Sequence, residues 1–190
     1  LGMGAQALGQ AAFAIGANSK AEGLWSVAIG QGASTGISGY FGISIGGNSS
    51  VTGTYSTAVG FENKVSNNMA TAIGFRNESS GNGSTTLGYK NKSTGSYAVS
   101  IGNQNIASGQ YSTALGYNSK ATGLISMAFG QGTYAKGQSA AAIGTGAWAY
   151  GDYTFASGQS RAYGGTSFSA NMITKATGYY SAAFGYATVS

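Results

Sequence analysis

Side chains able to carry out acid–base or metal chemistry are scarce in this sequence. The 190 residues include no histidine and no cysteine, and the carboxylates are Glu22, Glu62, Glu78 and Asp152. Catalytic dyads and metal centres need several such groups close together. Neighbouring repeats would bring Glu62 and Glu78 within reach of each other, as in β-helices that cleave polysaccharides, but we interpret both as surface charges. We therefore assign no catalytic, cofactor-binding or metal-ligating residue and expect a protein that is not an enzyme.

Two other motif types resemble functional signatures without their chemistry. Gly30-Gln31-Gly32 and Gly144-Thr145-Gly146 look like phosphate loops, but they lack the lysine–hydroxyl pair of a P-loop. Asn-x-Ser/Thr triplets begin at Asn48, Asn77, Asn82 and Asn91, and we interpret them as turn residues rather than glycan acceptors.

The composition excludes several classes of protein. Nine Lys and Arg against four Asp and Glu give a net charge of +5, without the clusters that a nucleic-acid groove requires. The 34 glycines occur without any proline, which excludes collagen, and 42% hydrophobic residues are too many for a disordered chain. Uninterrupted apolar runs are too short for a membrane span, so we expect no direct membrane insertion by this segment.

The positions of glycine reveal a repeat of fourteen residues. A bulky apolar residue, here called the anchor residue, precedes an anchor glycine once per period from Leu1-Gly2 to Ile143-Gly144, and the pattern continues in weaker form at Ser157-Gly158, Ala170-Asn171 and Phe184-Gly185. A second glycine follows most anchor glycines after seven residues, for example Gly109 and Gly123. Because glycine tolerates positive φ, we expect two tight turns per period. The predicted turn glycines are Gly16, Gly30, Gly46, Gly60, Gly74, Gly88, Gly102, Gly116, Gly130 and Gly144.

The residues between the turns alternate as in β-strands. Tyr111, Thr113 and Leu115 alternate with Ser112 and Ala114. The period therefore predicts an all-β, single-chain parallel β-roll or solenoid of about thirteen coils over residues 1–190, with two strands of about five residues per coil. Two extra residues between Gly30 and Gly46 predict a bulged loop, and one period near the C-terminal end is a residue short.

The alternation divides each strand into two faces. We expect the bulky face to fill the coil, with a repeat core of Ile15, Ile29, Ile45, Val59, Ile73, Leu87, Ile101, Leu115, Phe129 and Ile143. We expect the small residues to form an outer face that lets another chain approach closely. These candidate trimer-facing residues are Ser26, Ala28, Ser56, Ala58, Ser112, Ala114, Ser126 and Ala128.

The site four residues after each anchor glycine predicts an exposed column. Like charges do not follow one another there, and Glu78 stands between two lysines. The expected members are Lys20, Ser34, Ser50, Lys64, Glu78, Lys92, Ile106, Lys120, Tyr134, Trp148, Ala162 and Lys175.

Two groups of aromatic residues occupy defined positions in the repeat. Phe61, Phe75, Tyr89 and Tyr117 each follow an anchor glycine, which predicts a ladder at a corner of the coils. Exposed aromatic residues beside a cation favour a ligand surface, and the candidates are Tyr134, Lys136, Trp148 and Tyr150. The alternative for these residues is a seam between subunits of a trimer.

The repeated Ser-x-Ala-apolar-Gly unit resembles the head repeats of the trimeric autotransporter adhesins, the YadA-like family. Ser26–Gly30, Ser56–Gly60, Ser112–Gly116 and Ser126–Gly130 carry the motif literally. This resemblance implies a left-handed roll, a parallel homotrimer and display on a bacterial cell surface. It also implies anchorage in the outer membrane through a missing C-terminal stalk and anchor, adhesion to host cells or to matrix proteins such as collagen or fibronectin, and autoagglutination.

Two other functions are compatible with a repetitive rod. One is a spacer segment of a phage or bacterial fibre, which would continue into a capsid or baseplate attachment region. The other is an ice-binding solenoid, which requires a regular threonine array. Thr57, Thr71, Thr85 and Thr113 form part of such an array, but Val99 interrupts it.

Overall fold

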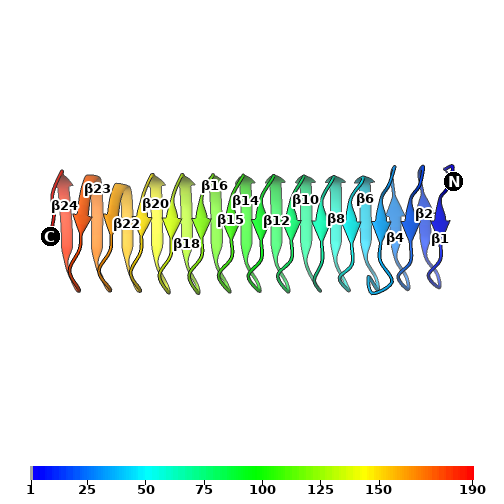
Figure 1. Cartoon of the computed structure of the whole chain (residues 1–190), viewed down its shortest axis with the longest axis horizontal. Helices are drawn as coiled ribbons and strands as arrows, with labels where there is room; N and C mark the ends of the chain where they lie inside the picture. Colours follow the sequence, from blue (N-terminus) through cyan, green and yellow to red (C-terminus); the bar gives the residue numbers. More distant parts are fainter. Residues whose placement is uncertain (1) are drawn as a thin grey trace. The chain divides into compact units, whose positions relative to one another are not determined.

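The structure, a computed structural model, describes residues 2–190, so the first anchor residue, Leu1, lies outside the described residues. It is an all-β parallel solenoid of about thirteen turns without a helix, as the repeat predicts. The chain divides into two compact units, residues 1–97 and residues 98–190, and each is described by itself. Within each unit, equivalent strands of successive coils lie side by side (Figure 1).

Each coil contains one long strand and one short strand. In residues 1–97 the long strands are β2 (Phe13–Ile15), β4 (Val27–Ile29), β6 (Ile43–Gly47), β8 (Thr57–Phe61), β10 (Thr71–Phe75) and β12 (Thr85–Tyr89). The short strands of this unit are β1 (Gln6–Ala7), β3 (Lys20–Ala21), β5 (Ser34–Thr35), β7 (Ser50–Val51), β9 (Lys64–Val65), β11 (Glu78–Ser79) and β13 (Lys92–Ser93).

Residues 98–190 repeat this plan and then merge the two strands of a coil. The long strands are β14 (Val99–Asn103), β16 (Thr113–Tyr117), β18 (Met127–Gln131), β20 (Ala141–Thr145) and β24 (Ala182–Tyr186), and the short strands are β15 (Ile106–Ala107), β17 (Lys120–Ala121), β19 (Tyr134–Ala135) and β21 (Trp148–Ala149). In β22 (Phe155–Ala162) and β23 (Phe168–Ala176), one continuous strand covers both segments.

The second strand of the coil is shorter than expected, with two residues in place of about five. After the long strand β8, Glu62 turns the chain with a φ of 53° and Asn63 points into the coil, which leaves Lys64 and Val65 for β9. The corner therefore uses residues that the alternation alone assigns to a strand.

Register is uniform except where a coil departs from fourteen residues. The two-residue insertion forms a loop over residues 36–42, closed by hydrogen bonds from the Gly39 N–H to the Gly36 carbonyl and from the Gly42 N–H to the Gly39 carbonyl. Pairing then resumes with Val27 opposite Ile43. The short coil loses its residue at the corner, where the pairing of β22 with β23 shifts between Gln159 and Arg161.

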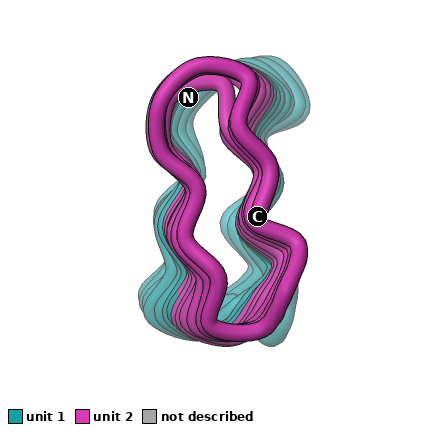
Figure 2. Tube along the Cα trace, turned by 90° about the vertical axis from the view of Figure 1, so that its left-hand side faces the viewer, with its two compact units in different colours: residues 1–97 teal, residues 98–190 magenta. Residues whose placement is uncertain are grey.

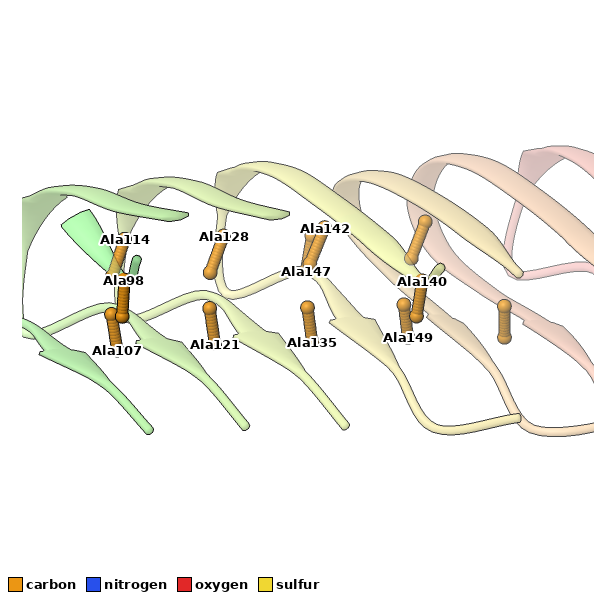
Figure 3. Packing of buried hydrophobic residues seen from close by; sticks show 12 residues of the cluster. Ala98, Ala107, Ala114, Ala121, Ala128, Ala135, Ala140, Ala142, Ala147 and Ala149 are labelled. Carbon is orange, nitrogen blue, oxygen red and sulfur yellow. The ribbon is translucent and has the colours of Figure 1, made fainter. Parts of the chain in front are cut away.

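The interior of the coil is built from small residues, so the predicted core is wrong. The residues proposed as trimer-facing are completely buried inside the coils: Ser26, Ala28, Ser56, Ala58, Ser112, Ala114, Ser126 and Ala128. In Figure 3, Ala114 and Ala128 of the long strands face Ala107 and Ala121 of the short strands across the interior.

The anchor residues point outward instead, and none belongs to the buried core. Ile15, Ile45, Ile73, Ile101 and Ile143 are exposed, and Ile29, Val59, Leu87, Leu115 and Phe129 are half-buried. The reason is space: the coils are flattened loops (Figure 2), and valine and asparagine are among the largest side chains that they enclose fully. Alternation identifies two faces of a strand but does not say which one faces inward.

The two glycine positions differ from the predicted turn glycines, one in its place in the coil and the other in its backbone angle. Anchor glycines do have positive φ, for example 120° at Gly60, but from Gly46 to Gly144 they lie inside long strands and not at the turns. At the second glycine, such as Gly109, φ is not positive. A Cβ atom there would overlap the carbonyl oxygen of Gly123 in the next coil, so close approach of two backbones requires glycine.

Candidate functional surfaces

Each carboxylate forms an ion pair or a hydrogen bond with a neighbouring residue of the chain. Glu62 accepts a hydrogen bond from Arg76 and forms an ion pair with it, which raises the pKa of Arg76. Glu22 pairs with Lys20. Asp152 Oδ1 accepts a hydrogen bond of 2.8 Å from the backbone N–H of Gln138.

Glu78 occupies its predicted place between Lys64 and Lys92. Its Oε2 lies 2.9 Å from Lys92 Nζ. This ion pair fits the interpretation of Glu78 as a surface charge rather than as a catalytic partner of Glu62.

Neither a metal-binding cluster nor a spanning helix is found in residues 2–190. Nowhere in that range do three or more Asp, Glu, His or Cys side chains gather as metal ligands. The same residues contain no helix long and apolar enough to cross a membrane. The Asn-x-Ser/Thr triplets at Asn77 and Asn91 begin with side chains that are 1% exposed, which is consistent with a structural role.

An apolar surface follows the long strands, and we call it the long-strand face. It consists of the anchor residues and the residues two positions before them. Its exposed members include Phe13, Ile15, Ile43, Ile45 and Ile73 in the first unit, and Ile101, Met127, Ile143, Phe168 and Phe184 in the second. In the second unit Phe155, Phe168 and Phe184 stack with ring-centroid distances of 4.9 and 5.0 Å. Threonine takes the position two before the anchor residue at Thr57, Thr71, Thr85 and Thr113, so the apolar character lies mainly along the row of anchor residues. Gathered exposed apolar side chains of this kind are typical of an interface.

Sequence reasoning missed a further row of large side chains, which we call the turn row, at the turn before most of the long strands. Trp25, Phe41 and Tyr55 have φ values of 57°, 55° and 56°, a conformation that is uncommon for aromatic residues. Their rings are stacked, with centroids 6.5 and 4.9 Å apart. The signal was present in the sequence, because a large residue directly precedes Ser26 and Ser56 of the repeat motif.

The predicted aromatic ladder at a corner exists in the first unit. Phe61, Phe75 and Tyr89 stack with centroids 5.4 and 5.5 Å apart. Arg76 and Lys90 lie over the Phe75 and Tyr89 rings, at 5.0 and 5.1 Å from the centroids. The ring stacking joins neighbouring coils, so the ladder serves stability. Tyr117, in the second unit, pairs in register with Gln131 rather than with another aromatic residue.

The four candidate ligand residues lie together on the outer side of the short strands in the second unit. Tyr134 meets Tyr150 edge to face at 5.5 Å, and Trp148 meets Tyr150 in the same way at 5.8 Å. Lys136 Nζ lies 5.9 Å from the centroid of the Tyr150 ring. Desolvation, with Tyr163 and Tyr134 nearby, raises the pKa of Tyr150, although Arg161 opposes that shift. Tyr150 is therefore a neutral hydroxyl group near neutral pH.

The structure adds two residues to this group and corrects the exposed column. Arg161, not Ala162, follows Trp148 in the column, and Ala162 is completely buried. The short coil shifts the register by one residue, which counting from the anchor glycine does not detect. The Arg161 guanidinium lies 4.3 Å from the Trp148 ring centroid, and Tyr163 stacks on Tyr150 at 5.0 Å.

We call these six residues, together with Lys120 and Lys175 in the same column, the aromatic–cation patch. It comprises Lys120, Tyr134, Lys136, Trp148, Tyr150, Arg161, Tyr163 and Lys175. Two hollows open on it. One, of about 420 Å³, is lined by Asn118, Lys120, Thr122, Gly132, Thr133, Tyr134, Trp148 and Tyr150. The other, of about 390 Å³, is lined by Thr145, Gly146, Gln159, Arg161, Ile173, Thr174 and Lys175.

Comparison with known proteins finds a family for the repeat. The family model described as YadA head domain repeat (2 copies) matches residues 7–33, 38–63, 66–90, 79–105, 107–133 and 135–160. These segments cover well over half of the chain and include the literal copies of the motif. A search of curated proteins finds no match.

Proposed function

This chain belongs to the family of YadA head domain repeats, and on that premise we propose that it is the non-catalytic head of a bacterial surface adhesin. Residues 1–190 act as one repeat domain that attaches to host cells or to extracellular matrix proteins of the collagen or fibronectin type. A C-terminal region outside this sequence anchors it in the outer membrane.

The observation that supports an assembly of several chains is the long-strand face. Rows of isoleucine and phenylalanine remain exposed on a chain whose own interior accepts only small side chains. Apolar side chains of this size are normally covered. We propose a parallel left-handed homotrimer in which the long-strand faces of three chains meet. This replaces the small-residue face expected from the sequence.

Attachment to the host then uses the surfaces that stay exposed in the trimer. The aromatic–cation patch lies on the short strands, whose outward side chains point away from the long-strand face. Half-buried Tyr134, Trp148 and Tyr150 are rigid contact groups, and aromatic residues of this kind dominate binding energy at interfaces. Three copies of the patch per trimer would raise the effective concentration of each.

The proposal is tested by adhesion of the purified chain. Wild-type protein should attach to cultured host cells, or to immobilised collagen or fibronectin, more strongly than to an albumin-coated surface. Trp148→Ala should reduce attachment by about tenfold, because it removes the central ring of the patch. The matched control is Trp25→Ala, which removes a ring from the turn row. Absence of attachment to every one of these surfaces would overturn the proposed function.

A further inference from the structure

The two units differ in how their charges are balanced. Residues 1–97 contain three carboxylates, and each forms an ion pair with a lysine or arginine. Residues 98–190 contain four cations, Lys120, Lys136, Arg161 and Lys175, and one carboxylate, Asp152. Asp152 lies at a turn, where it accepts the Gln138 N–H, and it forms no ion pair among the described residues. All four cations of this unit therefore lack a carboxylate partner within the described chain.

All four of these cations belong to the aromatic–cation patch. Lys120, Tyr134, Trp148, Arg161 and Lys175 occupy the same register on five successive coils. With an interstrand spacing of about 4.8 Å, this row spans about 19 Å. Cations therefore stand at both ends of the row and beside its aromatic centre. An arrangement of this length suits an extended chain with regularly placed negative charges better than a single small ion.

The aromatic centre can hold a ring whose faces are apolar and whose edges are polar. Arg161 covers one face of Trp148 from the following coil, and the hollow lined by Trp148 and Tyr134 opens on the preceding coil. Asn118 and Thr122 supply amide and hydroxyl groups around the same hollow. A pyranose ring has this polarity, because its C–H groups lie on its faces and its hydroxyl groups on its edges. Few polar groups around an aromatic wall are typical of small-ligand sites.

The arrangement favours a sugar chain over a single-stranded nucleic acid. Binding of successive bases requires a free aromatic face for each base. Here Tyr163 stacks on Tyr150 and Arg161 covers Trp148, so the protein's own groups occupy ring faces that such stacking would need.

We propose that the aromatic–cation patch is a binding site for an acidic polysaccharide, a glycan chain carrying sulfate or carboxylate groups. One sugar ring packs in the hollow between Tyr134 and Trp148, and neighbouring acidic groups bind Lys120, Lys136, Arg161 and Lys175. Charge-assisted hydrogen bonds from arginine and lysine to such groups are strong. This inference rests on the proposed function, since it names the ligand class of the same surface.

The test is binding of the full chain to immobilised heparin, with hyaluronan as the carboxylate-only glycan and dextran as the neutral one. We expect binding to heparin or hyaluronan that weakens as salt rises, and no binding to dextran. Preference between the two acidic glycans identifies sulfate or carboxylate as the recognised group. Trp148→Ala and Arg161→Gln should each weaken binding by about tenfold or more. Trp148→Phe should retain most of the binding.

Matched controls lie on the first unit. Lys64→Gln removes one charge from the same position of a short strand, and Tyr89→Ala removes an exposed ring, both outside the patch. Neither should change heparin affinity by more than about twofold. Circular dichroism and thermal melts confirm that each variant is folded.

Several results would overturn the inference. One is equal heparin binding by Trp148→Ala and by the controls. Another is binding of poly-glutamate or oligo-deoxythymidine as tight as that of the acidic glycans, which would indicate an acidic protein segment or a nucleic acid instead. Attachment to host cells or matrix without any glycan binding would sink this inference and leave the proposed function standing. Glycan binding without attachment to host cells or matrix would overturn the proposed function and leave this inference standing.

Discussion

A ladder of asparagine side chains holds the inner corner of the coils in the first unit. Asn77 Nδ2 donates to the carbonyl oxygens of Gly88 at 2.7 Å and Ile73 at 3.1 Å. Its Oδ1 accepts the backbone N–H of Asn91 at 3.0 Å, and the Asn63 side chain accepts the Asn77 N–H in the same way. One buried residue thus satisfies backbone groups of its own coil and of the next coil. Each such bond matters because an unpaired buried group costs about 1–3 kcal/mol.

Two glycines of one coil separate the effects of backbone angle and of space. Gly130 has a φ of 130°, and a Cβ there would overlap the carbonyl oxygen of Gly144, whereas Gly132 has a φ of 62° and open space around it. Gly130→Ala should lower the free energy of unfolding by more than about 2 kcal/mol, since strain and overlap add. Gly132→Asn should cost less than about 1 kcal/mol, because asparagine tolerates this angle. Urea unfolding followed by circular dichroism measures both, and equal losses would contradict this account.

At the scale of the elements, parallel strands, coil length and register were predictable because one period repeats many times. The inward face was not: Ile29 and Ala28 alternate in the same way whichever of them is buried. The narrow interior decides, because it has room for Ala28 and not for Ile29. Arg161 was missed for another reason. The position of a missing residue inside a coil depends on local backbone pairing, which the anchor glycines do not report.

The short coil predicts where the chain accepts an insertion. Its missing residue belongs to the corner between Gln159 and Ser160, which in other coils is occupied by a left-handed residue such as Asn118. Inserting one asparagine at that corner should change the free energy of unfolding by less than about 1 kcal/mol, because register on both sides is kept.

The matched comparison is an asparagine inserted between Ala142 and Ile143, inside β20 (Ala141–Thr145). This insertion exchanges the inward and outward faces of the rest of the strand and should cost more than about 3 kcal/mol. Thermal melts would compare the two variants. Similar losses would mean that the corner is no more tolerant than the strand.

Each unit of the molecule has two outer faces of different chemistry. The long-strand face is largely apolar, and the short-strand face carries most of the lysines and, in the second unit, the aromatic–cation patch. This division separates self-association from ligand binding, because burial of one face does not cover the other. The proposed trimer and the proposed glycan site are therefore compatible in one assembly.

Ile101 and Ile106 test this division within a single coil. Ile101 is on the long-strand face and 38% exposed, and Ile106 is in the short strand β15 and points outward. Ile101→Glu should shift the protein from trimer to monomer in light scattering, because burying three charges at one interface is unfavourable. Ile106→Glu should leave the trimer intact. A wild-type chain that is monomeric at micromolar concentration would refute the proposed assembly.

The narrow alanine- and serine-filled interior also bears on how such a surface changes over generations. Interior positions accept a handful of small residues, whereas outward positions of the short strands already hold lysine, glutamate, serine, isoleucine, tyrosine, tryptophan and arginine on the same backbone. Substitutions there leave the backbone ladder and the packing inside the coil untouched. Selection for a new target can therefore act on one coil at a time, with little penalty in folding.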